Sequence, residues 1–179
     1  MSFFHRSKGK NKVSVKEFGD VMAQLLIFRI KDEELKKDAE TFYVELNNDD
    51  DYHLFVSAMF NFYMWLVDYT SAKALNNKDK WNQCMDRFHW FVYDHYSEIG
   101  FITANFQDWY IETRATCSQF DNAVNKEPQV GELWAVAQVL SRHLFGQVQK
   151  DRVILTAIAD KAKTVISDYE KMMQEFQVE

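Results

Sequence analysis

The chain is poor in the residues that make tight turns, with five glycines and one proline among 179 residues. Hairpin-rich folds need such residues at frequent turns, so their scarcity disfavours an all-β fold and favours long helices. No two glycines stand close enough to build a phosphate-binding loop, which excludes the Walker-A and dinucleotide-binding motifs. A Gly-x-Ser-x-Gly nucleophile motif is also missing.

Metal-binding patterns are equally scarce. The two cysteines, Cys84 and Cys117, do not have the spacing of a zinc module. Carboxylate-bridged dimetal bundles need repeated Glu-x-x-His motifs, and the sequence contains none. The acidic run from Asn47 to Asp51 lacks the glycine and the final glutamate of an EF-hand loop. The sequence therefore predicts no bound cofactor.

Long apolar runs are missing too. The longest, Leu54 to Val67, is interrupted by Ser57 and Asn61, and it is too short to cross a bilayer. The first residues are basic, but no apolar segment follows them as a secretory signal requires. We therefore expect a protein of the cytoplasm.

Positive charge is confined mainly to the start of the chain. The formal net charge is −6, yet five of the 21 Lys and Arg residues fall within the first sixteen residues, which contain no acid. The rest of the chain is strongly acidic. Nucleic-acid binding needs a basic face, so we expect no nucleic-acid partner.

Aromatic residues, by contrast, form 16% of the chain, and apolar residues recur at helical spacing almost throughout. We predict an all-α fold, a single-domain bundle of six or seven helices that are mostly antiparallel neighbours. This domain should cover residues 14–179, with a capping box at Ser14 and Glu17, after a basic flexible arm at residues 1–13. The last two helical patterns are nearly in phase, so two helices and one bent helix both remain open.

The most apolar helix should run from Asp51 to about Leu75, and a helix apolar on nearly every side is usually central. Its polar side chains fall on one stripe: His53, Ser57, Asn61 and Asp68. The stripe is either a narrow face that reaches water or a polar lining inside the bundle.

The segment from Arg87 to Tyr96, RFHWFVYDHY, combines aromatic residues, histidines and an aspartate. Helical spacing places Asp86 and His89 on one face. If the flanking helices form an antiparallel pair folded about Gly100, His89 lies level with Glu112. These three side chains are a candidate metal or catalytic site, although aromatic packing is the simpler interpretation of the segment.

The same register places Cys84 level with Cys117, with both on apolar stripes. Packed helices stand about 8–10 Å apart, so facing cysteines can approach the roughly 4.4–6.8 Å Cα separation of a disulfide. We expect two packed thiols in a reducing cytoplasm and an intramolecular bond after mild oxidation, which makes them a candidate redox pair.

The amino-terminal arm mixes apolar and basic side chains: Phe3, Phe4, Arg6, Lys8, Lys10 and Lys12. Such a segment can rest on an anionic membrane surface or bind an acidic partner. A loose terminal tail is the simplest alternative.

These patterns favour a non-catalytic binding or protein-interaction module with an aromatic-rich core. Its partner would be another protein, a second copy of the chain or a small apolar ligand. One alternative is a helical-bundle metal protein or enzyme that uses Asp86, His89 and Glu112. The other is a membrane-peripheral protein recruited by its basic arm.

Overall fold

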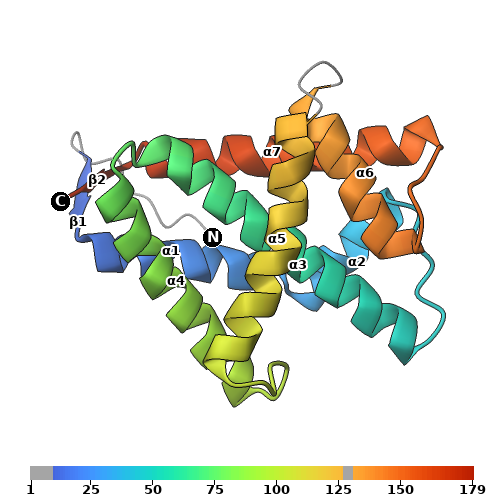
Figure 1. Ribbon diagram of the computed structural model, residues 1–179, viewed down its shortest axis with the longest axis horizontal. Coiled ribbons are helices and arrows are strands. Elements are labelled where there is room, and N and C mark those ends of the chain that lie inside the picture. Colours follow the sequence, from blue (N-terminus) through green and yellow to red (C-terminus); the bar gives the residue numbers. More distant parts are fainter. Residues whose placement is uncertain (1–9, 127–130) are drawn as a thin grey trace.

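A computed structural model describes residues 10–126 and 131–179, and it confirms an all-α, single-domain bundle (Figure 1). The described residues form seven helices and a small two-stranded sheet. In chain order the elements are β1 (Asn11–Val13), α1 (Val15–Arg29), α2 (Asp32–Thr41), α3 (Asp49–Ala74), α4 (Lys78–Glu98), α5 (Phe106–Lys126), α6 (Glu132–Phe145), α7 (Arg152–Met173) and β2 (Phe176–Val178).

The helix boundaries follow local capping signals. Ser14 and Glu17 form the predicted capping box, in which each side chain bonds the other residue's backbone N–H. The Asn48 and Asn77 side chains cap α3 and α4 by accepting a hydrogen bond from the first turn of each helix. Gly146, with a φ of 69°, ends α6 in the left-handed conformation, so the last two helical patterns are separate helices.

Helix α3 is central, as its apolar sequence predicts, and it contacts each of the other six helices (Figure 1). Trp65 is fully buried and stacks on Tyr69 and Phe120, with ring centroids 4.9 and 5.4 Å away. Its indole N–H donates to Asp121 at 2.8 Å, which satisfies the polar end of a buried ring. None of the described helices combines the length and apolar character needed to cross a membrane.

Helix α4 packs along α1, not along α5, which corrects the hairpin register expected from the sequence. Helices α4 and α5 meet near their connecting loop and then diverge (Figure 1). Their ring contacts join residues 89–93 to residues 106–110. The reason is the close fit of α1 on α4 at Gly19, where an added Cβ would stand 2.7 Å from the Cys84 carbonyl oxygen.

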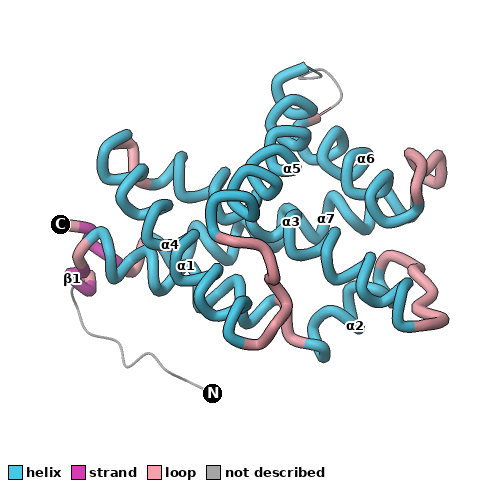
Figure 2. Tube along the Cα trace, turned by 60° about the horizontal axis from the view of Figure 1, so that its bottom comes forward, coloured by secondary structure: helices cyan, strands magenta, loops and turns pink. Residues whose placement is uncertain are grey.

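A short parallel sheet joins the two ends of the described chain at one edge of the bundle (Figure 2). Asn11 pairs with Phe176 and Val13 with Val178, and the Phe176 ring packs edge-on against Phe18, with centroids 5.9 Å apart. This differs from the expected flexible arm through residue 13 and from a last helix that continues to Phe176. Pairing between distant segments leaves no local signal in either one.

Charged side chains tie several helices together in the interior. Asp38 of α2 is 1% exposed, accepts a hydrogen bond from the Tyr63 hydroxyl of α3 and forms an ion pair with Lys161 of α7. Arg29 of α1 pairs with Asp168 of α7 at 2.8 Å. Buried charges are stable only when paired, so the Asp38 group fixes how α2 and α3 meet α7. The Arg29–Asp168 pair, whose carboxylate is 46% exposed, links α1 to α7 nearer the surface.

Candidate functional site

The residues of the polar stripe of α3 lie in two different environments. Its amino-terminal part, with His53, Ser57 and Asn61, lines a cleft of about 600 Å³ between α3 and α5. Asp68, two turns further along, is 7% exposed and forms an ion pair with Arg114 of α5. Burial raises the pKa of the Asp68 carboxyl, and the guanidinium opposes this shift. The stripe is therefore open to a cleft at one end and buried at the other.

We call the first hollow the α3–α5 cleft. The loop between α4 and α5 forms part of its lining. The Tyr93 hydroxyl holds this loop by donating a hydrogen bond to the Ala104 carbonyl at 3.1 Å. Its described lining consists of His53, Ser57, Phe60, Asn61, Gly100, Phe101, Ile102, Thr103, Ala104, Trp109, Glu112, Thr113 and Thr116.

Thr113 is the most informative polar residue of the cleft. Its side chain is 4% exposed and makes no hydrogen bond within residues 10–126 and 131–179, and its hydroxyl oxygen is not among the fully buried polar atoms that lack a partner. The side chains of Ser57 and Glu112 likewise make no hydrogen bond to the described part of the protein. Asn61, by contrast, donates to the Ser57 carbonyl at 3.0 Å. Several polar side chains that make no hydrogen bond to the described residues thus line the same cleft.

Aromatic rings form the apolar part of the same cleft. Phe60 and Trp109 are nearly buried, while Phe101 is 39% exposed, and the rings of Phe60 and Phe101 lie 5.7 Å apart. Among the described lining residues Glu112 is the one carboxylate, and neither lysine nor arginine is present. The lining suits an aromatic or neutral group with hydrogen-bond donors better than an anion.

The residues predicted to form a metal site do not come together. His89 is 4% exposed and packs on the rings of Trp109 and Tyr110, and its Nδ1 lies 2.6 Å from the Met85 carbonyl oxygen. Asp86 is exposed on α4, and Glu112 lines the α3–α5 cleft. Across the ranges that the structure describes, no group of three or more His, Cys, Asp or Glu side chains could hold a metal.

The environment of His89 is that of a core residue. Burial lowers the pKa of its imidazole to about 4, and the Arg114 charge adds to this shift while the Met85 carbonyl opposes it. A neutral ring that donates from Nδ1 to the carbonyl satisfies these surroundings. His89 therefore belongs to the aromatic packing between α4 and α5.

No family model, curated protein or solved structure matches this chain. Any proposal for its function therefore rests on the residues that line its own clefts.

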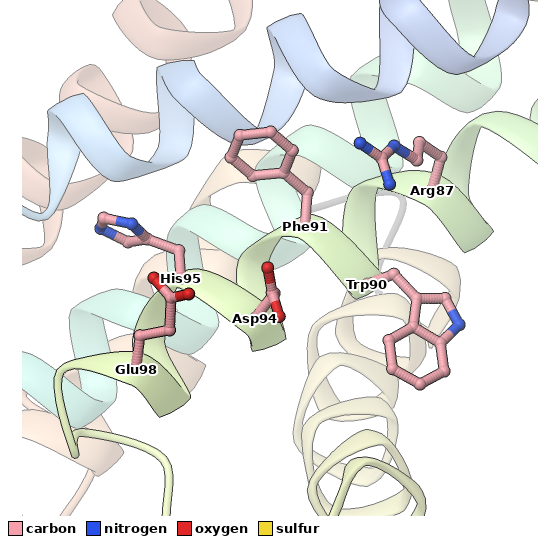
Figure 3. A pocket seen from close by; sticks show the side chains of 6 residues that line it. All are labelled: Arg87, Trp90, Phe91, Asp94, His95 and Glu98. Carbon is pink, nitrogen blue, oxygen red and sulfur yellow. The ribbon is translucent and has the colours of Figure 1, made fainter.

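The outer side of the aromatic segment on α4 forms a groove of about 420 Å³ (Figure 3). In it, Phe91 points toward α1, and Trp90 extends toward α5, where it stacks flat on Phe106 with centroids 3.9 Å apart. The described lining all comes from this one helix: Arg87, Trp90, Phe91, Asp94, His95 and Glu98. The segment that looked most like a site thus packs the bundle on one side and forms a shallow groove on the other.

The two cysteines lie in different interfaces. Cys84 is buried where α4 meets α1, and the Cys117 sulfur lies 3.8 Å from the Asn61 carbonyl oxygen, where α5 meets α3. Both are free thiols, and burial raises the pKa of each to about 12. The predicted redox pair loses its geometric basis, because α4 and α5 diverge.

The amino-terminal arm is described only in part. Phe3, Phe4, Arg6 and Lys8 lie outside the described residues, so the membrane and partner predictions for them stay predictions. Lys12 forms an ion pair with Glu179 next to the β1–β2 sheet.

Lys10 lines a further cleft, of about 510 Å³, beside that sheet. No pattern in the sequence indicates this cleft, because it forms only where β1 and β2 meet. For the α3–α5 cleft one signal was present: Thr113 is a polar residue at an inward position of an apolar helical stripe.

Proposed function

We propose that this protein is a non-catalytic binding module that takes a small neutral ligand in the α3–α5 cleft. The observation that carries the proposal is the cleft itself, in which the side chains of Thr113 and Ser57 make no hydrogen bond to the described residues and lie beside aromatic rings. A bound molecule that pairs with these hydroxyls gains hydrogen bonds that the protein does not already make, each worth about 0.5–1.5 kcal/mol.

The size and lining of the cleft support the same proposal. Its volume of about 600 Å³ falls in the range of small-molecule sites, which combine apolar walls with a few placed polar groups. Here the rings of Phe101 and Trp109 supply apolar wall, while Ser57 and Thr113 offer hydroxyls. The Glu112 carboxylate favours a ligand that donates hydrogen bonds and disfavours an anion.

The arrangement of the polar groups favours binding over catalysis. Ser57 and His53 lie one helical turn apart on α3, but no hydrogen bond joins them in the described structure. An activated serine needs a base within hydrogen-bond reach. The described lining contains neither cysteine nor lysine as another nucleophile.

Ligand-observed NMR with benzamide and benzyl alcohol tests this proposal. Both probes combine one aromatic ring with one hydrogen-bonding group. We expect the wild-type protein to bind at least one of them and to leave it chemically unchanged. Ser57→Trp should abolish binding, because the exposed position at the cleft allows the protein to fold while the indole fills the space.

A matched control is Ser118→Trp, which adds the same ring at an exposed position on α5 outside the cleft. It should bind the probes as the wild type does. Thr113→Val, which keeps the shape and removes the hydroxyl, should weaken binding about fivefold or more, the cost of one lost hydrogen bond. Binding that survives in Ser57→Trp, or no binding of either probe, would contradict the proposal.

A further inference from the structure

A second cleft lies on another side of the fold, next to the β1–β2 sheet, and we call it the lysine cleft. It is enclosed by segments from both ends of the described chain, by the turn between α3 and α4, and by the end of α7. Its cationic side chains are those of Lys10, Lys73 and Lys80. None of these residues belongs to the α3–α5 cleft.

The lining of this cleft contains more basic than acidic side chains, whereas the whole protein has a negative net charge. Besides Lys73, the lining has two lysines, Lys10 and Lys80, and one carboxylate, Glu170, in a chain whose formal net charge is −6. Lys80 uses one N–H to reach the Val178 carbonyl at 2.9 Å, which leaves two of its three donors for another partner. The Lys73 ammonium is already engaged, since it donates a hydrogen bond to the Tyr69 hydroxyl and stands 4.0 Å from the centre of that ring. The cleft is therefore a local positive region on an acidic molecule.

The remaining lining is largely apolar. Phe18 and Met173 are buried at the cleft, and Leu75, Phe176 and Val178 are half-buried around them. A small inorganic anion would use the ammonium groups and leave these surfaces in water. A ligand with an acid group at one end and an apolar chain at the other would cover both.

We propose that the lysine cleft binds a small organic anion that carries an apolar chain, a carboxylate or a phosphate monoester. Its acid group lies between Lys10 and Lys80, and its chain covers Phe176 and Val178. Such a ligand touches β2 and the turn between α3 and α4 together. Its binding therefore stabilises the closed β1–β2 sheet and raises the thermal midpoint of unfolding.

Isothermal titration calorimetry of the full chain with octanoate, octyl phosphate and octanol tests this inference. We expect at least one of the two acids to bind with a Kd of about 1 mM or tighter. Octanol, which has the same chain and no charge, should bind about tenfold more weakly, since exposed charge pairs each add a factor of about two to five. The preference for the acid should shrink with added salt.

Three lysine variants locate the acid group. Lys10→Gln and Lys80→Gln should each weaken acid binding about two- to fivefold and leave octanol binding unchanged. Lys78→Gln is the matched control, because Lys78 lies at the start of the same helix but outside this cleft. It should bind as the wild type does.

Three results would overturn the inference: equal affinity for octanol and the acids, equal loss in Lys78→Gln, or capture on phosphatidylserine vesicles without binding of either soluble acid. The last result would point to a lipid surface. None of them bears on the α3–α5 cleft, whose probes are neutral and whose variants lie elsewhere.

Discussion

His89 is a histidine that the folded protein keeps uncharged. Its pKa is lowered from 6.5 to about 4 by burial, while the unfolded chain binds a proton near the ordinary value. Protonation therefore favours the unfolded state. The free energy of unfolding is therefore highest above about pH 6.5. It falls by about 3 kcal/mol in all as the pH drops toward 4.

Urea unfolding at about pH 7.5 and pH 5 measures this effect. We expect the wild-type free energy of unfolding to fall by about 2 kcal/mol more than that of His89→Phe between these pH values. His95→Phe is the matched control on the same helix, since His95 is less buried, and it should keep the wild-type pH dependence. An unchanged dependence in His89→Phe would show that this histidine titrates normally.

The cysteines lead to a second prediction at this scale. Because burial raises both thiol pKa values to about 12, neither Cys84 nor Cys117 should react with iodoacetamide at about pH 8 in the folded protein. Both should react in urea. Because they lie in different interfaces, mild oxidation of the folded protein should form no intramolecular disulfide. Intact mass after native and denatured labelling checks both points, and a native-state bridge would restore the hairpin register that we have corrected.

At the scale of elements, the closest helix contact depends on one residue. Gly19 brings α1 against the backbone of α4 at Cys84, and an added methyl group would stand 2.7 Å from that carbonyl oxygen. Gly19→Ala should cost about 1–3 kcal/mol by overpacking, partly offset by about 1 kcal/mol of helix propensity. We expect a net loss of about 1–2 kcal/mol in urea unfolding.

Gln83→Ala provides the comparison for Gly19→Ala. Gln83 precedes Cys84 on α4 but is exposed, so its truncation should change the free energy of unfolding by no more than about 0.5 kcal/mol. If Gly19→Ala is as stable as the wild type, the two helices are not held as closely as described.

The elements themselves were largely predictable, because their signals are local. The capping box at Ser14 and Glu17 and the left-handed Gly146 are encoded within a few residues of each helix end. The pairing of α4 with α1 was not predictable in this way. It depends on the missing side chain of Gly19, and a glycine in a helical pattern does not reveal which backbone will approach it.

At the scale of the whole molecule, the candidate sites also combine features that the sequence predicts locally with contacts that it does not predict. The α3 stripe and the inward Thr113 could be read from helical spacing, but the cleft between them exists only because α3 and α5 pack together. The lysine cleft depends on residues that are even further apart in the sequence, since both Lys10 and Val178 line it. Sequence periodicity orients a side chain on its own helix and leaves its distant neighbours undetermined.

The interior ion pair is the strongest test of how the whole bundle is assembled. Asp38 is 1% exposed and links the Tyr63 hydroxyl of α3 to the Lys161 ammonium of α7. Asp38→Asn keeps the shape but leaves Lys161, 19% exposed, without its counter-charge. Breaking a buried pair in this way costs about 3–5 kcal/mol, which we expect as the loss in urea unfolding.

The double variant Asp38→Asn with Lys161→Met separates the charge from the packing. Removing the unpaired ammonium should recover about 1–3 kcal/mol relative to Asp38→Asn alone, so the two substitutions should be clearly non-additive. The pair of Glu34 and Lys37 provides the comparison, since the Lys37 side chain that Glu34→Gln leaves unpaired is 65% exposed, and this substitution should change stability far less. Additive losses in the double variant would mean that Asp38 and Lys161 act separately. The contact of α2 with α7 would then rest on apolar packing alone.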